Sequence, residues 1–180
     1  MKMQNGFTLG EMLAVVSIVG ITLATGVPYI NKMITTNRIS TQTNGFIALM
    51  NHAKSEAIKR SATVSVCPQN AKANGCSTNW SAGYISFVDK NSNGSVDPGD
   101  TILRSYSNTI AGNKVSVLLT GASTVVSYVG YTSSGSSEAN NAINFTFCYP
   151  TADNLRILTL TPVGQLKYST IFKLSKNSCN

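Results

Sequence analysis

Several residue types on which enzymes and metal sites depend are scarce in this sequence. Asp, Glu, Lys and Arg make up only 12% of its 180 residues, about half the usual share for a soluble protein. His52 is the only histidine, and none of the four cysteines forms a CxxC pair, which argues against a zinc site. No nucleophile, base and acid are arranged as a catalytic set. The sequence therefore predicts a protein that is not an enzyme and has no cofactor, apart from a calcium loop considered below.

The charge that is present is mostly positive. The chain has 14 Lys and Arg against 7 Asp and Glu, a net charge of +7. A basic surface attracts DNA, anionic lipid or acidic partners, and charge alone does not choose between them. A nucleic-acid partner therefore needs support from a motif as well.

A long apolar segment follows a short polar leader at the N-terminus. The leader is MKMQNG, residues 1–6, and 19 uncharged residues run from Met12 to Ile30. As a helix this run is about 28 Å long, enough to cross a bilayer. No small-residue cleavage site follows it, so we expect the segment to be retained as a membrane anchor. Glu11 is costly at the start of such a helix unless it is neutralised or lies at the membrane interface.

The sequence GFTLGE at residues 6–11, followed by an apolar helix containing Pro28, resembles the class III signal sequence of type IV pilins and type II secretion pseudopilins. The resemblance implies that a prepilin peptidase cleaves between Gly6 and Phe7 and methylates the new N-terminal phenylalanine. It also implies that Glu11 neutralises the N-terminal amine of a neighbouring subunit during assembly, and we expect Pro28 to contribute to assembly as well. The physics agrees, because an unpaired charge is costly inside a lipid-free filament core.

A helical pattern continues beyond the anchor. Apolar residues recur at helical spacing at Phe46, Met50, Ala53 and Ala57. This stripe predicts an amphipathic helix whose apolar face packs on a sheet. Pro28 removes one helix hydrogen bond and marks a point where we expect the helix to kink or soften.

Beyond residue 61 the pattern changes to short β runs separated by turn residues. The candidate strands are Thr63–Cys67, Tyr84–Val88, Ile102–Tyr106, Val115–Leu119, Val125–Tyr131, Ile143–Cys148, Arg156–Leu160 and Leu166–Tyr168. They predict two small antiparallel sheets, or one bent sheet, over the helix. The expected fold class is α+β and type IV pilin-like, with a long N-terminal helix packed against a small antiparallel β-sheet head. Its expected parts are a leader at 1–6, a transmembrane and assembly helix at 7–30, the amphipathic half of the helix at 31–61 and a disulfide-stabilised head at 62–180.

A second resemblance lies in residues 76–104, CSTNWSAGYISFVDKNSNGSVDPGDTILR. This stretch is similar to the head of the FimT/FimU and GspH group of minor pilins, which commonly has Cys, Trp, Gly, a Phe-Val-Asp strand and an Asn-Gly-x-x-Asp-x-Gly-Asp turn in this order. SEAIKRS at Ser55–Ser61 matches the same group. The resemblance covers residues 6–106 well and the remainder weakly. It implies a minor subunit near the pilus tip and not the abundant shaft pilin.

The four cysteines indicate two disulfides formed in an oxidising compartment. Four cysteines allow three connectivities. The short separation of Cys67 and Cys76, together with the resemblance to the minor pilins, favours the pairs Cys67–Cys76 and Cys148–Cys179. The second bridge would tether a C-terminal tail that would otherwise fray.

The acidic stretch at residues 89–100 has the spacing of a calcium loop. Its oxygen-bearing residues are Asp89, Asn91, Asn93, Asp97 and Asp100. Glycine lies at the sixth position, and Asp replaces the usual final Glu. The same residue types are also common in ordinary hairpin turns, so a calcium loop and a simple turn both stay open as interpretations.

DNA is a second partner to consider. FimT-type members of the group bind DNA through a C-terminal Gly-Arg-x-Arg motif, whose counterpart here is Gly164-Gln165-Leu166-Lys167. Both arginines are absent, and lysine is a point charge without the planar fork that suits phosphate. We therefore expect weakened DNA affinity. The candidate DNA-binding residues are Arg156, Gln165, Lys167, Lys173 and Lys176.

Taken together, the sequence predicts a minor pilin in a tip-initiating complex that supports type IV pilus assembly. The alternatives are a DNA-binding minor pilin for natural transformation and a GspH-like pseudopilin of type II secretion. The expected partners are other minor and major pilins and the prepilin peptidase. The protein is expected to reside in the inner membrane with a single span and a periplasmic head, and then in the extracellular pilus.

Overall fold

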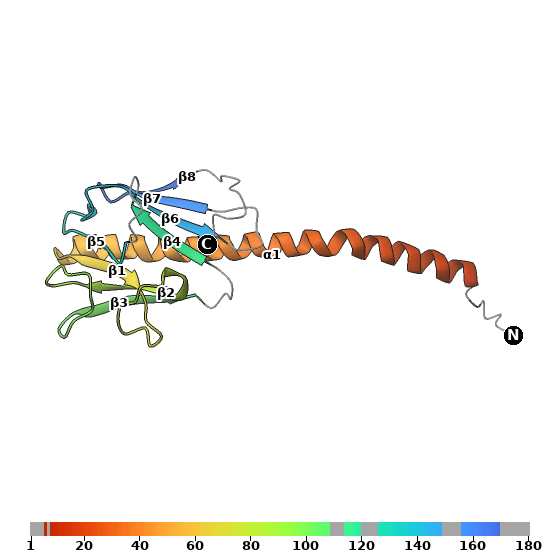
Figure 1. The fold of residues 1–180 in the computed structure, drawn as a ribbon, viewed down its shortest axis with the longest axis horizontal. Coiled ribbons are helices and arrows are strands. Elements are labelled where there is room, and N and C mark those ends of the chain that lie inside the picture. The colour runs from red at the N-terminus through yellow and green to blue at the C-terminus, as the bar shows by residue number, and fades with distance from the viewer. Residues whose placement is uncertain (1–5, 7, 109–113, 120–125, 149–155, 170–180) are drawn as a thin grey trace. The chain divides into compact units, whose positions relative to one another are not determined.

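The computed structural model describes residues 6, 8–108, 114–119, 126–148 and 156–169. Contacts divide the chain into two compact units, Met1–Thr35 and Thr36–Asn180. One helix, α1 (Leu9–Arg60), supplies all the regular structure of the first unit and the first element of the second (Figure 1). Its backbone is helical at Pro28, where the sequence predicts a softer point.

The end of α1 is closed by a Schellman arrangement. Ser61 takes a left-handed conformation with φ of 50°, and its N–H donates to the carbonyl of Ile58 while that of Ala62 donates to the carbonyl of Ala57. These bonds satisfy carbonyl groups that the helix end would otherwise leave free. Lys59 and Arg60 lie in the last turn, where positive charge is favourable to the helix dipole.

The remainder of the second unit is two four-stranded antiparallel sheets (Figure 1). The first has the order β3-β2-β1-β5 and the second the order β4-β6-β7-β8. The strands are β1 (Val64–Pro68), β2 (Gly83–Val88), β3 (Thr101–Ser107), β4 (Lys114–Leu119), β5 (Val129–Tyr131), β6 (Ile143–Cys148), β7 (Arg156–Leu160) and β8 (Leu166–Ser169), and a short 3-10 helix, η1 (Trp80–Ala82), precedes β2.

The α+β fold class and all eight predicted strands are confirmed, with one clear difference in length. The sequence starts the fifth strand at Val125, whereas β5 starts at Val129. The carbonyl of Val126 accepts a hydrogen bond of 2.8 Å from the indole nitrogen of Trp80. This residue therefore meets a side chain of η1 and does not extend the strand.

The core lies between α1 and the inner faces of the two sheets, and Phe46 is at its centre. The ring of Phe46 is inaccessible to solvent. Its centroid lies 4.9 Å from that of Tyr84 in the first sheet and 4.6 Å and 5.4 Å from those of Phe145 and Phe147 in the second. Trp80 completes the cluster at 6.4 Å. One helical side chain thus contacts both sheets.

The sheets also meet where two turns touch. The N–H of Ser137 donates to the carbonyl of Pro162 at 2.9 Å, and Lys54 Nζ of α1 donates to the carbonyl of Gly164 at 2.9 Å. A Cβ on Gly164, whose φ is 74°, would overlap the carbonyl oxygen of Gly135. Glycine at position 164 is therefore required by this close approach.

We expect Phe46→Ala to lower the free energy of unfolding of the head by about 3–5 kcal/mol, because it leaves a cavity between helix and both sheets. Urea denaturation of the full chain in detergent micelles, followed by fluorescence of the single tryptophan, measures this. Ile58→Ala is the control on the same helix. Ile58 is 50% exposed, so this change should cost about 0.5 kcal/mol. Equal losses in the two variants would contradict the central role of Phe46.

Candidate functional site

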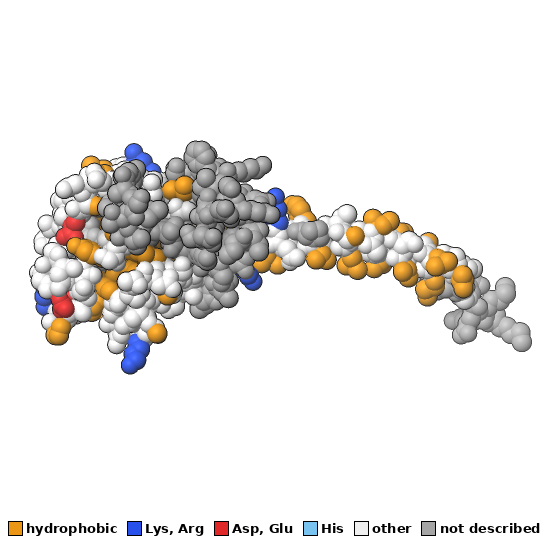
Figure 2. Space-filling model, viewed as in Figure 1, with side chains coloured by type: hydrophobic (Ala, Val, Ile, Leu, Met, Phe, Trp, Pro, Cys, Tyr) orange, Lys and Arg blue, Asp and Glu red, His pale blue; other side chains and the backbone are white. Residues whose placement is uncertain are grey.

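The first candidate surface is the apolar part of α1 in the first unit. Figure 2 shows hydrophobic side chains along it. Large side chains that are more than about half exposed include Leu9, Met12, Leu13, Val16, Ile18, Ile21, Leu23, Ile30 and Met33. By length and composition α1 can cross a membrane, with mean hydropathy of 2.0 in its most apolar window. Such a surface is unfavourable in water, and burial in lipid or against other apolar helices removes the cost.

The start of α1 is a capping box. The main-chain N–H of Thr8 donates to Glu11 Oε2 at 2.9 Å, and the Thr8 hydroxyl donates to the same oxygen at 3.0 Å. In return, the N–H of Glu11 donates to Thr8 Oγ1 at 3.3 Å. This reciprocal pattern satisfies N–H groups that have no partner within the helix.

The capping box adds a local role to a residue that the sequence assigns to assembly. The signal was present as Thr-x-x-Glu before an apolar run, but sequence analysis did not use it. Gly6 is exposed, whereas Phe7 lies outside the described residues. Cleavage between them and the assembly roles of Glu11 and Pro28 stay predictions.

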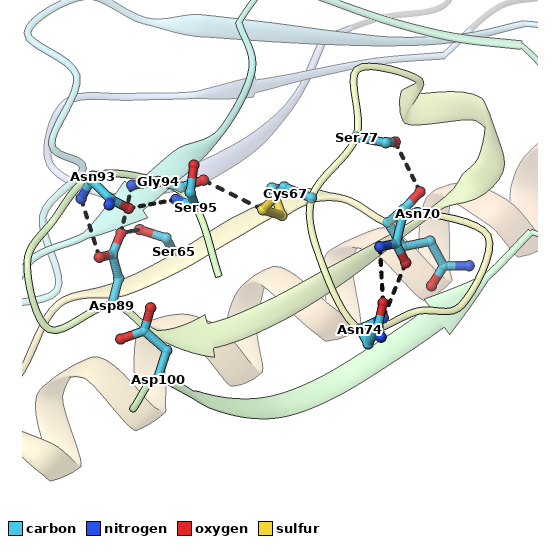
Figure 3. The surroundings of a disulfide bond; sticks show 12 residues. Ser65, Cys67, Asn70, Asn74, Ser77, Asp89, Asn93, Gly94, Ser95 and Asp100 are labelled. Atoms are coloured by element: carbon cyan, nitrogen blue, oxygen red, sulfur yellow. Dashed lines mark hydrogen bonds between the residues drawn. A yellow bond between two sulfur atoms is a disulfide. The ribbon is translucent and has the colours of Figure 1, made fainter. Parts of the chain in front are cut away.

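The second candidate region is the outer face of the first sheet. There Cys67, Ile85 and Phe87 are buried under Cys76, Val96 and Tyr128, six residues that we call the outer cluster. Cys67 and Cys76 form a disulfide, as predicted (Figure 3). Cys148 is also disulfide-bonded; its predicted partner, Cys179, lies outside the described residues.

The acidic turn, residues 89–100, joins β2 to β3 beside this disulfide (Figure 3). Asp89 is 1% exposed, and its carboxylate accepts hydrogen bonds from Ser65 Oγ at 2.8 Å and from the N–H groups of Asn93 and Gly94 at 3.2 Å and 2.8 Å. Cys76 Sγ lies 3.4 Å from the carbonyl oxygen of Gly94. A single buried carboxylate therefore holds the turn to β1.

The other oxygen-bearing residues of the turn bond to one another. The side-chain nitrogens of Asn91 and Asn93 donate to Asp97 Oδ2 at 3.0 Å and 2.6 Å, and these bonds lower the pKa of Asp97. Asp100 accepts from the N–H groups of Lys90 and Asp97. In this arrangement the amide nitrogens of the two asparagines, and not their oxygens, face Asp97.

These hydrogen bonds hold the turn closed in the structure. No group of three or more His, Cys, Asp or Glu residues is placed to hold a metal in the part of the chain that the structure describes. Calcium binding by this turn stays a prediction of the sequence.

The structure separates two of the five candidate DNA-binding residues, Arg156 and Lys167. In the strand register Arg156 is opposite Phe147, whereas Lys167 is opposite Thr159. Side chains alternate between faces along a strand, so Arg156 and Lys167 lie on opposite faces of the second sheet. Gln165 is exposed in the turn between β7 and β8. Lys173 and Lys176 lie outside the described residues.

Glu138 is a functional candidate that the sequence pattern does not single out. Its Oε2 is shielded from solvent and accepts no hydrogen bond from the described residues, because the carboxyl group packs directly on Gly130. The side chain borders a cavity of about 270 Å³ that Tyr128 also lines. Burial, and secondarily the negative charge of Asp89, raises the pKa of Glu138.

We expect Asp89→Asn to destabilise the head by about 1–3 kcal/mol, because the amide cannot accept all three hydrogen bonds that the carboxylate accepts. Asp97→Asn is the matched control, since its donors are side-chain amides that water can satisfy, and it should cost about 0.5 kcal/mol. Thermal unfolding measured with calcium and again with a chelator checks both variants. A stabilisation by calcium that Asp97→Asn abolishes would favour the metal-site interpretation over the hydrogen-bonded turn.

The raised pKa of Glu138 predicts a pH-dependent stability with a definite sign. The folded state favours the protonated acid more than the unfolded state does, so this group's contribution to stability increases as pH falls through the folded pKa. Glu138→Gln should therefore stabilise the head at neutral pH, with a gain that shrinks on acidification. Glu56→Gln should behave oppositely, because its bond to Arg60 lowers the pKa of Glu56. Unfolding midpoints measured from neutral pH into the acidic range test both variants. A Glu138→Gln effect that is independent of pH would contradict the raised pKa of Glu138.

The sequence pattern of the family described as type II transport protein GspH matches residues 42–164. None of the curated sequences that were compared with this chain matches it.

Three solved structures have a similar fold. The type IV minor pilin FimU of Pseudomonas aeruginosa PAO1 in space group P21 is 17% identical with a TM-score of 0.56, over 79% of this chain and 93% of that one. A second crystal form of FimU gives 17% and 0.54, over 75% and 92%. The minor pseudopilin EpsH of the Type 2 Secretion System of Vibrio cholerae gives 12% and 0.50, over 74% and 97%.

Proposed function

Because this chain belongs to the GspH family of type II transport proteins and has a pilin-like fold, we propose that it is a minor pilin, a structural subunit of a type IV pilus. The observation that carries the proposal is the apolar part of α1, whose large side chains are exposed and which is followed in the chain by a β-rich head. A helix of this kind has two suitable environments, the bilayer before assembly and the packed centre of a filament afterwards.

The change of environment gives Glu11 its role. At the membrane interface its charge can stay hydrated. Inside a filament it needs a partner, and the N-terminal amine of a neighbouring subunit, created by cleavage between Gly6 and Phe7, is the group of opposite charge at the same end of the helix. Pairing the two makes burial of both tolerable, whereas either alone would be strongly unfavourable.

The proposal includes a processing route and a place in the cell. A prepilin peptidase cleaves the leader, the mature chain stays in the inner membrane through α1, and assembly with other minor and major pilins moves it into the pilus. We place it in a tip-initiating complex, because its sequence resembles minor subunits and not shaft pilins.

Two variants separate the charge of Glu11 from its capping role. Glu11→Gln keeps the Thr-x-x-Gln capping box but removes the charge, so we expect membrane insertion to be retained and incorporation into sheared pili to be lost. Thr8→Ala removes the capping hydroxyl but keeps the charge, and incorporation should persist. Immunoblots of membrane and sheared-pilus fractions measure both. Normal incorporation of Glu11→Gln would overturn the charge-pairing mechanism.

The same fractions distinguish the two systems to which the family relates. Co-purification with major and minor pilins from sheared pili supports the pilus assignment. Recovery with the components of a type II secretion machine, and absence from pili, would assign the chain to a pseudopilus. Normal type IV pilus assembly after deletion of the gene would also contradict the proposed function.

A further inference from the structure

The chain contains four Asn-Gly pairs, at residues 5–6, 44–45, 74–75 and 93–94. In such a pair the glycine nitrogen can attack the asparagine side chain, because glycine has no Cβ to hinder the approach. We propose that Asn74, in the loop closed by the Cys67–Cys76 disulfide, is a site of spontaneous deamidation, and that the fold protects Asn44 and Asn93.

Asn74 has the features that the reaction needs. Its side chain is exposed, and within the described residues the N–H of Gly75 donates no hydrogen bond. Asn70 Nδ2 donates to Asn74 Oδ1 at 2.9 Å, as Figure 3 shows. The attacking nitrogen is therefore unengaged, and the carbonyl oxygen of the amide already faces a hydrogen-bond donor.

The reaction balances without any reagent other than water. Hydroxide removes the proton of the Gly75 N–H, and the nitrogen forms a bond to Cγ of Asn74. The negative charge that develops on Oδ1 is stabilised by the amide of Asn70, which acts as an oxyanion donor. Water protonates the departing nitrogen, which leaves as ammonia and regenerates hydroxide, and the five-membered succinimide that remains is opened by water to aspartate or isoaspartate.

Asn93 has the same sequence context and the opposite environment. The N–H of Gly94 donates to the buried carboxylate of Asp89 at 2.8 Å, and Asn93 Oδ1 accepts from the N–H of Ser95 at 2.8 Å. The nitrogen must leave a charge-assisted hydrogen bond before it can attack. The free energy needed to break such a bond makes deamidation at Asn93 roughly ten- to hundred-fold slower.

Asn44 is protected differently. It lies within α1, where the N–H of Gly45 is part of the helical hydrogen-bond ladder. The ring of Tyr106 packs so closely on Gly45 that a Cβ there would contact it. The nitrogen cannot turn toward its neighbour's side chain without breaking the helix. Asn5 lies outside the described residues and within the predicted leader.

Deamidation at Asn74 would change the loop in two ways. It adds one negative charge to a chain whose net charge is +7. The isoaspartate product also inserts a methylene group into the main chain between Cys67 and Cys76, in a turn that the Asn70 N–H closes by donating to the carbonyl of Gly75 at 2.9 Å.

The test is incubation of the purified full chain in detergent micelles at mildly alkaline pH, with peptide mapping by mass spectrometry over time. We expect deamidation at Asn74 to be roughly ten- to hundred-fold faster than at Asn93 and faster than at Asn44. Equal rates at Asn74 and Asn93, or reaction at Asn93 while Asn74 stays intact, would overturn the proposal.

Two variants sharpen the test. Asn74→Gln should abolish the acidic charge variant that we expect Asn74 to produce on ion exchange, because cyclisation of the longer side chain is slower. Asp89→Asn should raise the rate at Asn93 by releasing the N–H of Gly94, while the rate at Asn74 stays the same. If Asp89→Asn leaves the rate at Asn93 unchanged, the protection that we assign to the buried carboxylate is wrong.

Discussion

The head depends on contact between one face of α1 and two sheets that do not share a strand among the described residues. Phe46 makes this contact to both sheets at once, and the small residues Ala53 and Ala57, both inaccessible to solvent, allow the helix to approach closely. Burying a whole aromatic side chain is worth about 1.5–3 kcal/mol, and the ring pairs add to this. The sheets are organised around the helix, and the hydrogen bond from Ser137 to Pro162 adds a direct link between them.

The two parts of α1 therefore differ in how their apolar residues are arranged. In the second unit most of its apolar residues form one buried stripe, whereas in the first unit apolar residues occur around the whole circumference and are exposed. A helix that is apolar on all sides is typical of burial in lipid or in a bundle. The capping box at Thr8 and Glu11 shows how the helix start is stabilised locally. The capping box does not require the negative charge of Glu11, because a glutamine at this position would form the same box.

The sequence predicted the positions of the helix and strands better than the way in which they pair and pack. Alternation and turn residues located all eight strands, and helical spacing identified the buried stripe through Phe46. Neither reveals register, which is why Arg156 and Lys167 look like one basic site in sequence although pairing with Phe147 and Thr159 puts them on opposite faces. The orphaned oxygen of Glu138 was equally hidden, because it results from packing against Gly130, whose position is set by the pairing of β5 with β1.

The acidic turn illustrates why a sequence motif alone does not show whether its oxygens bind a metal ion or accept hydrogen bonds. Calcium loops and hydrogen-bonded turns both need closely spaced oxygens and a glycine with positive φ, and Gly94 has a φ of 73°. What differs is the direction in which the oxygens point. Asp89 is directed at β1 and at main-chain donors of its own turn, so its negative charge is stabilised by fixed dipoles in a buried site. This gives the residue a structural reason to be acidic that is independent of any ion, and it ties the turn to the sheet beside the Cys67–Cys76 disulfide.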